Sequence, residues 1–194
     1  MKVIGIKGNY NASEKAQVYL MADSSLLKDG NPLFLPDFAQ EFIAYPALVV
    51  RINRLGKNIA KRFASRYYDA LTVGLCVEAK QIDGKAKIAD SASLINAFDG
   101  AAILGDFATI ENYDLTSGHI ISINSTNGDN VELNTTEMVL DIDSLIEELS
   151  KYYTFKIGDI LFTGYKPEHG IKLSINDTIT GKLDDNELLH FKIK

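Results

Sequence analysis

An apolar run that ends in a small hydroxyl residue and a glycine offers the clearest chemistry in this sequence. Residues 158–164 read Gly-Asp-Ile-Leu-Phe-Thr-Gly. Gly158 and Asp159 are typical of a turn, and the apolar residues after them indicate a buried strand. Such a strand brings a hydroxyl oxygen and backbone N–H groups to the rim of a pocket, where they can bind an anion. We therefore expect Thr163 and Gly164 to contact a ligand, although an ordinary core strand that ends in a turn has the same pattern.

The single cysteine and the three histidines give weaker signals. Cys76 lies in the β-rich run 71–77, which favours a buried small hydrophobic residue over a catalytic thiol, because reactive cysteines need electropositive surroundings. The histidines have no spacing typical of a metal site. Only His169, beside Glu168, is a candidate functional histidine, and loop histidines of this kind are more often bystanders.

Length, composition and charge limit the class of protein. The chain has 194 residues, 46% of them hydrophobic, which suits a single domain over residues 1–194. A net charge of -6 argues against a nucleic-acid surface, and we interpret the basic residues between Arg51 and Arg66 as the solvated face of a helix. One cysteine cannot form an internal disulfide, and no secretory segment or ~20-residue apolar span is present. We expect a cytoplasmic protein with no membrane partner.

These residues need strands and helices to position them. Alternation, helical spacing and turn residues predict the following elements: a first strand over 1–6, a hairpin of 26–27 with 33–35, a strand over 47–52, an amphipathic helix over 58–70, a strand over 71–77, a loop over 80–87, strands over 101–107, 119–123 and 130–133, a turn at 127–129, a helix over 144–153 capped by Asp143, and strands over 178–183 and 188–193.

Several blocks of the sequence resemble one known protein family, in the same order. Residues 154–164 are similar to its C-terminal signature Thr-Leu-x-x-Gly-Asp-x-Ile-x-Thr-Gly, and Gly8-Asn9-Tyr10 resembles its Gly-x-Asn-Tyr. Further similar blocks lie at 23–26, 48–52, 68–74, 97–99, 104–105, 134–138 and 142–149. Over nearly its whole length the chain resembles the fumarylacetoacetate hydrolase family.

The resemblance implies a fold, a partner and a class of substrates. The fold is α+β but mostly β, a mixed β-sandwich roll with a few helices on its outside. The resemblance also implies a homodimer, with residues 48–50 and nearby strands contributing to the interface. Family members hydrolyse, isomerise or decarboxylate diketo and oxo acids, such as fumarylacetoacetate, acylpyruvates, oxaloacetate and hydroxyheptadienedioate. Active members use Mg²⁺ or Mn²⁺.

The family's functional positions hold other residues here. The resemblance places two acidic metal ligands at Tyr45 and Ala47, a third at Cys76, and a lysine at Asn96. Hard divalent cations prefer anionic oxygen ligands, so we predict no metal and no catalytic residue at these positions. Other family positions are changed as well: Ser13, Ala16, Met21, Val131 and the loop 165–170.

The first hypothesis is therefore a catalytically inactive homologue. It would bind a small carboxylate through Tyr45, Asn96, Asp99, Thr163 and Gly164, or would act through a partner such as an active relative in a mixed dimer.

Two alternatives remain open at this point. An active hydrolase or isomerase could use a relocated site, with Glu41, Glu78 or Asp99 holding a metal, or could work without a metal. A purely structural dimer without a ligand is the third possibility. Its mark would be a pocket filled by the large side chains of Tyr45, Met21 and Tyr165.

Overall fold

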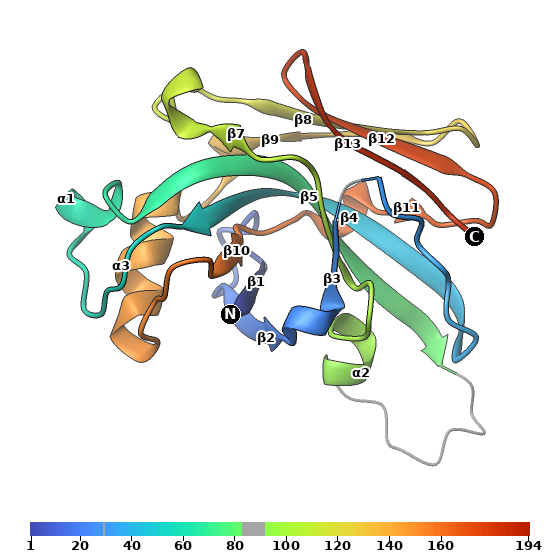
Figure 1. The fold of residues 1–194 in the computed structure, drawn as a ribbon, viewed down its shortest axis with the longest axis horizontal. Helices are drawn as coiled ribbons and strands as arrows, with labels where there is room; N and C mark the ends of the chain where they lie inside the picture. Colours follow the sequence, from blue (N-terminus) through green and yellow to red (C-terminus); the bar gives the residue numbers. More distant parts are fainter. Residues whose placement is uncertain (29, 83–91) are drawn as a thin grey trace.

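Figure 1 shows the protein as a computed structural model, which describes residues 1–28, 30–82 and 92–194. The chain is mostly β, with 44% of residues in strands and 16% in helices. This agrees with the expected fold class. The loop predicted over 80–87 lies outside the described residues except for 80–82, which continue a strand. No helix of the described part is long and apolar enough to cross a membrane.

Two long antiparallel strands, β4 (Ala39–Ile52) and β5 (Tyr68–Ile82), cross the middle of the molecule. Their pairing runs from Ala39 opposite Ile82 to Ile52 opposite Tyr68. Because side chains alternate between the two faces of a strand, this register divides the residues of both strands into two sets. Both strands are longer than predicted, because polar residues near their free ends are paired as well.

A nine-stranded mixed sheet is built around this pair, in the order β2-β1-β10-β4-β5-β6-β3. The strands added to the pair are β1 (Val3–Lys7), β2 (Gln17–Met21), β3 (Leu26–Lys28), β6 (Ala102–Leu104) and β10 (Ile160–Phe162), with β7 (Ala108–Thr109) on β5 and β11 (Ile171–Lys172) on β4. β1 runs parallel to β10, so the two ends of the chain meet in one sheet.

A four-stranded sheet lies above the first, in the order β13-β12-β8-β9. Its strands are β8 (Ile120–Ser125), β9 (Asn130–Asn134), β12 (Thr178–Leu183) and β13 (Asn186–Lys192). The predicted hairpin turn at 127–129 joins β8 to β9, with Gly128 at a φ of 101° that favours glycine. The strand predicted over 178–183 is confirmed without change.

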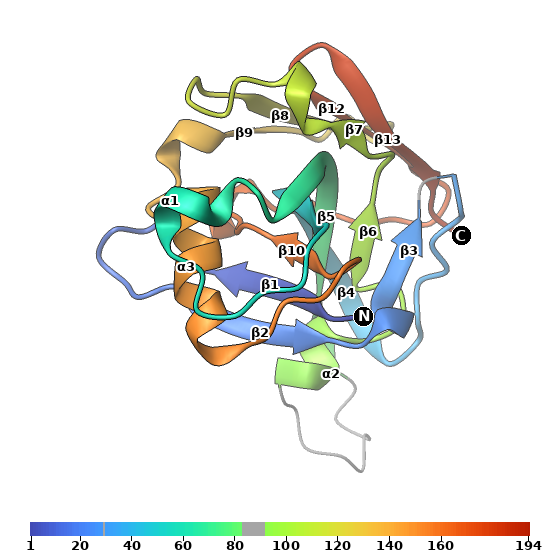
Figure 2. The same cartoon turned by 60° about the vertical axis from the view of Figure 1, so that its left-hand side comes forward.

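Short helices complete the fold. They are α1 (Lys61–Ala64), α2 (Ala92–Asn96), α3 (Ile142–Tyr152) and the 3₁₀ turns η1 (Asp23–Ser25), η2 (Ile110–Asn112), η3 (Thr135–Glu137) and η4 (Pro167–His169). In Figure 2, α1 and α3 lie on one side of the large sheet and α2 lies below it. The N-cap of α3 is Asp141, not the predicted Asp143, because Asp141 Oδ1 accepts the backbone N–H of Ser144 at 2.7 Å.

Two further expectations were wrong because tertiary pairing overrides a local pattern. The predicted helix over 58–70 is only the single turn α1, and Tyr68 and Ala70 instead pair with β4. The predicted hairpin of 26–27 with 33–35 does not form. β3 pairs in parallel with β6, and Leu33 bridges Ile193 near the C-terminus.

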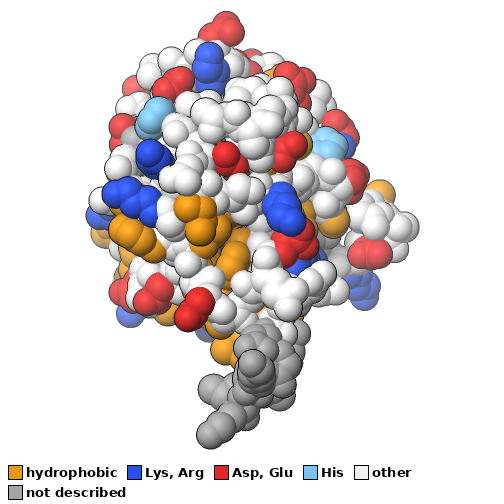
Figure 3. All heavy atoms as spheres, turned by 90° about the vertical axis from the view of Figure 1, so that its right-hand side faces the viewer, with side chains coloured by type: hydrophobic (Ala, Val, Ile, Leu, Met, Phe, Trp, Pro, Cys, Tyr) orange, Lys and Arg blue, Asp and Glu red, His pale blue; other side chains and the backbone are white. Residues whose placement is uncertain are grey.

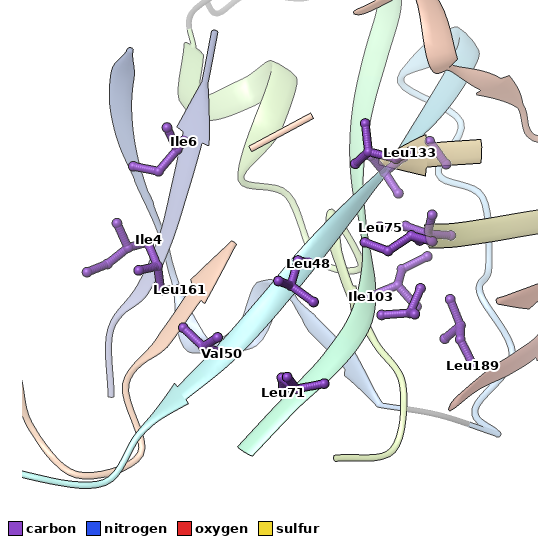
Figure 4. Close-up of a cluster of buried hydrophobic side chains, with 14 of the residues drawn as sticks. Ile4, Ile6, Leu48, Val50, Leu71, Leu75, Ile103, Leu133, Leu161 and Leu189 are labelled. Carbon is purple, nitrogen blue, oxygen red and sulfur yellow. The ribbon is translucent and has the colours of Figure 1, made fainter. Parts of the chain in front are cut away.

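The main core fills the space between the two sheets and under α3. Figure 4 shows its centre, with Leu48 and Val50 of β4 beside Leu71 and Leu75 of β5. The opposite face of the large sheet carries a second apolar cluster, which includes Tyr45, Ala47, Cys76, Phe162 and Tyr165. Buried apolar surface contributes about 25 cal/mol per Å², so both clusters stabilise the fold. Only the second cluster contains the positions that the family resemblance assigns to metal ligands.

Asn9 connects three separate segments of the chain by hydrogen bonds. It is fully buried, and its Nδ2 donates to the carbonyl oxygens of Leu140 at 2.9 Å and Thr163 at 2.8 Å. Its Oδ1 accepts the N–H of Leu140 at 2.9 Å. Gly164, at a φ of 130°, lets the chain pass Asn9 closely, because a Cβ there would lie 2.8 Å from Asn9 Cβ.

We predict that Asn9→Ala lowers the free energy of unfolding by about 2–4 kcal/mol, because it leaves buried backbone groups without partners. Urea unfolding followed by circular dichroism measures this change. The matched control is Asn11→Ala, whose exposed side chain accepts hydrogen bonds from Ser13 and should change stability by less than about 1 kcal/mol. Equal effects of the two substitutions would contradict the assigned role of Asn9.

Candidate functional site

Three positions that the family resemblance assigns to metal ligands lie together in the structure. Tyr45 is opposite Cys76 in the β4–β5 pairing, and Ala47 is opposite Gly74. Tyr45, Ala47 and Cys76 alternate onto the same face of the sheet, and all three belong to the second apolar cluster. The fold therefore brings these positions together, and a phenol, a methyl group and a thiol stand there in place of carboxylates.

Large aromatic side chains fill the space in front of these positions. The rings of Tyr45 and Tyr165 stack with their centroids 4.7 Å apart and an angle of 19° between planes. Tyr165 is 1% exposed, Tyr45 is 6% exposed, and Met21 belongs to the same cluster. This filling is the feature expected of a purely structural protein without a ligand, so a ligand would have to bind beside these positions and not in front of them.

Glu78 lies two residues further along β5 and is buried among donors. The hydroxyl of Tyr165 donates to its Oε1 at 2.5 Å, and Lys7 Nζ lies 2.8 Å from the same oxygen. Lys80 forms an ion pair with Oε2. Burial by itself raises the pKa of Glu78, but the hydrogen bonds from Lys7, Lys80 and Tyr165 outweigh it, and the net pKa is lowered. Glu78 is therefore a carboxylate at neutral pH.

The neighbouring hydroxyl and thiol groups hold their protons tightly. Burial raises the pKa of Tyr165, and the nearby Cys76 and Glu78 raise it further. Burial also raises the pKa of the Cys76 thiol to about 12, so it stays protonated at neutral pH. The Cys76 side chain is 2% exposed, which confirms its interpretation as a buried small hydrophobic residue.

A hollow of about 380 Å³ opens beside Glu78, and we call it the lysine hollow. Its lining joins β1, β2, β5 and α2 and consists of Lys7, Gln17, Val18, Tyr19, Glu78, Lys80, Ile95 and Asn96. Two lysines and one carboxylate give it a net charge of +1 (2 − 1). Asn96 Oδ1 is buried and has no hydrogen-bond partner among the residues described, so the predicted ligand residue Asn96 has an unsatisfied polar end at this hollow.

Lys7, Lys80 and Tyr19 were not singled out from the sequence. Lys80 could have been found, because it stands two residues after Glu78 on a strand and so shares its face. Lys7 could not, since 71 positions separate it from Glu78. Tyr19 reaches the hollow because Gly5 on β1 has no Cβ, which would otherwise lie 2.2 Å from the Tyr19 ring.

The other predicted ligand residues lie in different surroundings. Thr163 is fully buried, and both its N–H and its hydroxyl donate to the carbonyl oxygen of Leu48, at 2.9 Å and 3.0 Å. Gly164 packs on Asn9. Asp99 is exposed after α2. Anion binding by Thr163 and Gly164 stays a prediction, and a ligand there would have to compete with the bonds to Leu48.

The acidic residues considered for a relocated metal site have separate partners. Glu41 forms an ion pair with Lys172 at 3.0 Å, whereas Glu78 is held by Lys7 and Lys80. Within residues 1–28, 30–82 and 92–194, no three acidic, histidine or cysteine side chains gather as a metal site would require. His169 Nδ1 is buried without a partner in the same described part.

Figure 3 shows the face of the molecule on the right of Figure 1. Acidic and basic side chains are interspersed over it, and neither sign forms a continuous field. The absence of a nucleic-acid partner stays a prediction.

Comparisons with known proteins agree with this geometry. Residues 6–188 match the sequence model of the family described as fumarylacetoacetate (FAA) hydrolase C-terminal. The chain is 27% identical over 184 residues to oxaloacetate tautomerase fahd-1 of Caenorhabditis elegans, covering 93% of this chain and 85% of that protein. It is 31% identical over 150 residues to oxaloacetate tautomerase fahd2 of Xenopus laevis, covering 76% of this chain but only 46% of that protein.

Solved structures share the fold at low sequence identity. Fumarylpyruvate hydrolase from Pseudomonas aeruginosa, solved with Mn²⁺ and pyruvate, superposes with a TM-score of 0.86 at 18% identity, over 100% of this chain and 89% of that one. 5-Carboxymethyl-2-hydroxymuconate delta-isomerase from Mycobacterium smegmatis gives 0.85 at 21% identity, over 99% and 78%. Because the family model matches nearly the whole chain, over residues 6–188, the chain belongs to the fumarylacetoacetate hydrolase family.

Proposed function

We propose that this protein binds a small carboxylate in the lysine hollow and does not carry out the metal-dependent chemistry of its family. The proposal rests on which residues occupy the paired positions of β4 and β5. Tyr45, Ala47 and Cys76 lie side by side without a carboxylate, and the Tyr165 ring stacks on Tyr45. Mg²⁺ and Mn²⁺ do not fit this set of donors, because they prefer carboxylate, carbonyl and water oxygens.

The nearest carboxylate does not replace the missing ligands. Glu78 already accepts hydrogen bonds from Lys7, Lys80 and Tyr165. A metal ion at Glu78 would displace two ammonium groups or lie beside them, which is unfavourable in a partly buried site. No reaction step through a metal is therefore assigned to this chain.

The lysine hollow suits a small carboxylate for reasons of charge and size. A lysine ammonium has three N–H donors, and Glu78 uses only some of those on Lys7 and Lys80. The atom of Asn96 that has no partner in the described chain is the acceptor Oδ1, which suits a hydroxyl hydrogen of an enol or acid and not a carboxylate oxygen. A volume of about 380 Å³ falls within the range of small-molecule sites. The substrates named for its relatives, oxaloacetate and fumarylpyruvate, are oxo carboxylates of this size class.

A metal-free isomerase is the second candidate, and one observation favours it. Keto–enol tautomerisation moves one proton from a carbon to the carbonyl oxygen and needs only an acid and a base. Lys80 and Glu78 are paired at the hollow, and could fill these roles. Against this, the lowered pKa of Glu78 makes it a weak base, and the hydrogen bond to Glu78 helps to raise the pKa of Lys80, which makes it a weak acid.

The homodimer and the cytoplasmic location also remain proposals. Leu48, Val49 and Val50 are at most 1% exposed, so their side chains are covered by the chain itself and offer no surface to a partner. An interface would use other residues, such as the exposed apolar side chains of Val18 and Leu20 on β2. Analytical ultracentrifugation of Leu20→Lys beside the unmodified protein tests that surface.

Oxalate and pyruvate should bind the chelator-treated protein, and Lys80→Met should weaken that binding by about tenfold, because it removes one cation and leaves its stem in place. Isothermal titration calorimetry gives both affinities. Lys7→Met should have a similar effect. Lys172→Met, which removes the partner of Glu41 outside the hollow, is the matched control and should bind normally. Equal binding by all the variants would exclude the lysine hollow as the site.

Mg²⁺ and Mn²⁺ should produce no binding heat with the chelator-treated protein, with or without oxalate, because the donor set does not suit them. The Pseudomonas aeruginosa fumarylpyruvate hydrolase, which was solved with Mn²⁺, is the positive control. Oxaloacetate tautomerisation is followed in parallel by ultraviolet absorbance of the enol. Metal uptake enhanced by oxalate would refute the inactive assignment. Enol conversion without metal that is lost in Glu78→Gln would establish the second candidate.

Stability should depend on pH through Glu78 in a defined direction. The pKa of Glu78 is lower in the folded protein than in the unfolded chain. Its ionisation therefore stabilises the folded state at pH values above the ordinary glutamate pKa. This contribution is lost as the pH falls through the lowered value. Tyr165→Phe removes one donor, so the pKa of Glu78 should rise, and acid unfolding should begin at a higher pH. Carboxyl ¹³C NMR reports the pKa, and Tyr152→Phe, on the exposed end of α3, is the control.

A further inference from the structure

A second cavity lies where α3 begins, and it shares no lining residue with the lysine hollow. Its volume is about 430 Å³. The walls come from residues 115–119 before β8, from residues 135–143 around η3 and the first turn of α3, and from Leu48 and Tyr68 in the large sheet. We call it the Asp143 cavity. Neither the family's metal-ligand positions nor the aromatic stack of Tyr45 and Tyr165 lies in it.

Asp143 is a half-buried carboxylate at this cavity with one oxygen in use. The hydroxyl of Tyr68 donates to Asp143 Oδ1 at 2.9 Å. The nearby cation Lys61 pairs with Asp141 Oδ2 at 2.8 Å, and in the described part of the chain Asp143 itself forms no ion pair. Burial raises the pKa of Asp143, and the charge of Asp141 adds to this effect, while the hydrogen bond from Tyr68 and the charge of Lys61 oppose it without cancelling it. A bound cation would compensate the charge that burial leaves poorly solvated.

The hydroxyl groups of Thr116, Ser117 and Thr136 at the cavity already donate their hydrogens within the protein. The hydroxyl of Thr116 donates to Asp114 Oδ1 at 2.7 Å, and that of Thr136 donates to Asn134 Oδ1 at 2.8 Å. These hydroxyl oxygens keep lone pairs but offer no hydrogen to a ligand. A ligand that binds to Thr116 and Thr136 must therefore supply the donors itself.

His119 is also saturated on both ring nitrogens. Nδ1 lies 2.8 Å from Asp184 Oδ2, and Nε2 lies 2.9 Å from the carbonyl oxygen of Asp114. Both ring nitrogens are therefore engaged with groups of the protein itself. His119 consequently supports the wall of the cavity and offers no donor to a ligand.

Apolar side chains complete the wall beside these acceptors. Leu48, Leu115, Met138 and Ile142 all line the cavity. This mixture suits a short alkyl chain with a donor group at one end, since it combines an apolar surface with a few polar contacts. A bare metal ion fits less well, because no group of three acidic, histidine or cysteine residues is present in the described ranges and the volume exceeds that of an ion.

We propose that the Asp143 cavity binds a small organic cation, a primary amine with a short alkyl body. The ammonium group would lie on Asp143, with Thr116 and Thr136 accepting its remaining hydrogens, and the alkyl part would lie against Leu115 and Met138. The site is independent of the lysine hollow, which carries the opposite charge.

The test uses n-butylamine as the probe and 1-butanol as the neutral molecule of the same shape. Calorimetry gives affinities, and ¹⁵N–¹H NMR of the full chain locates the site. We expect butylamine to shift amide signals within residues 115–119 and 135–143, and 1-butanol to bind at least about tenfold more weakly. Asp143→Asn keeps an acceptor for Tyr68 but removes the charge, and it should also weaken butylamine binding about tenfold.

Control measurements distinguish the loss of the Asp143 charge from a loss of folding. Glu132→Gln removes an exposed acidic residue of β9 that is not in the cavity wall, and it should bind butylamine normally. Thermal melting checks that Asp143→Asn is folded. If this variant is unfolded, the amide signals that butylamine shifts in the unmodified protein decide whether the cavity is the binding site. The proposal is overturned by equal affinity for butanol and butylamine, by unchanged binding to folded Asp143→Asn, or by shifts that are absent or lie at Lys7 and Lys80.

Discussion

The antiparallel pairing of β4 with β5 is the constraint on which the rest of the structure depends. Side chains alternate between the two faces of a strand, so once Tyr45 is opposite Cys76 every neighbouring side chain is assigned to one face or the other. One face packs against the four-stranded sheet and α3, and the other carries Tyr45, Cys76 and Glu78. A shift of one residue would turn Glu78 into the main core, where a charge is strongly unfavourable. The pairing therefore fixes both the core and the site.

Glu78 shows how a buried charge is tolerated on this frame. Its carboxylate is 3% exposed, and its stability there depends on cations from two strands, Lys7 on β1 and Lys80 on β5. β1 reaches this place through its parallel pairing with β10, next to β4. The same contacts that neutralise Glu78 leave a positive hollow beside it. Fold and site chemistry are thus separate: the family fold is retained while the groups on one face have changed.

Local elements of the fold could be predicted from the sequence, and long-range pairings could not. The turn at 127–129 and the strand over 178–183 depend on glycine geometry and on alternation between near neighbours. The segment 58–70 has apolar residues at helical spacing, yet its last residues gain more from pairing with β4 than from a helix. Likewise, Leu33 bridges Ile193 at the other end of the chain, a partner that no local pattern indicates.

For the site, the sequence by itself determined which chemical groups are present, and the family blocks determined where the metal-ligand positions fall. Tyr45, Ala47 and Cys76 are non-acidic whatever the fold, because a residue's type does not depend on folding. Only the tertiary structure decided what surrounds them: the Tyr165 ring on Tyr45, the lysine from β1 on Glu78, and the bonds that engage Thr163 with Leu48. These contacts join residues far apart in the chain, and packing and hydrogen bonding between strands, not local propensity, select them.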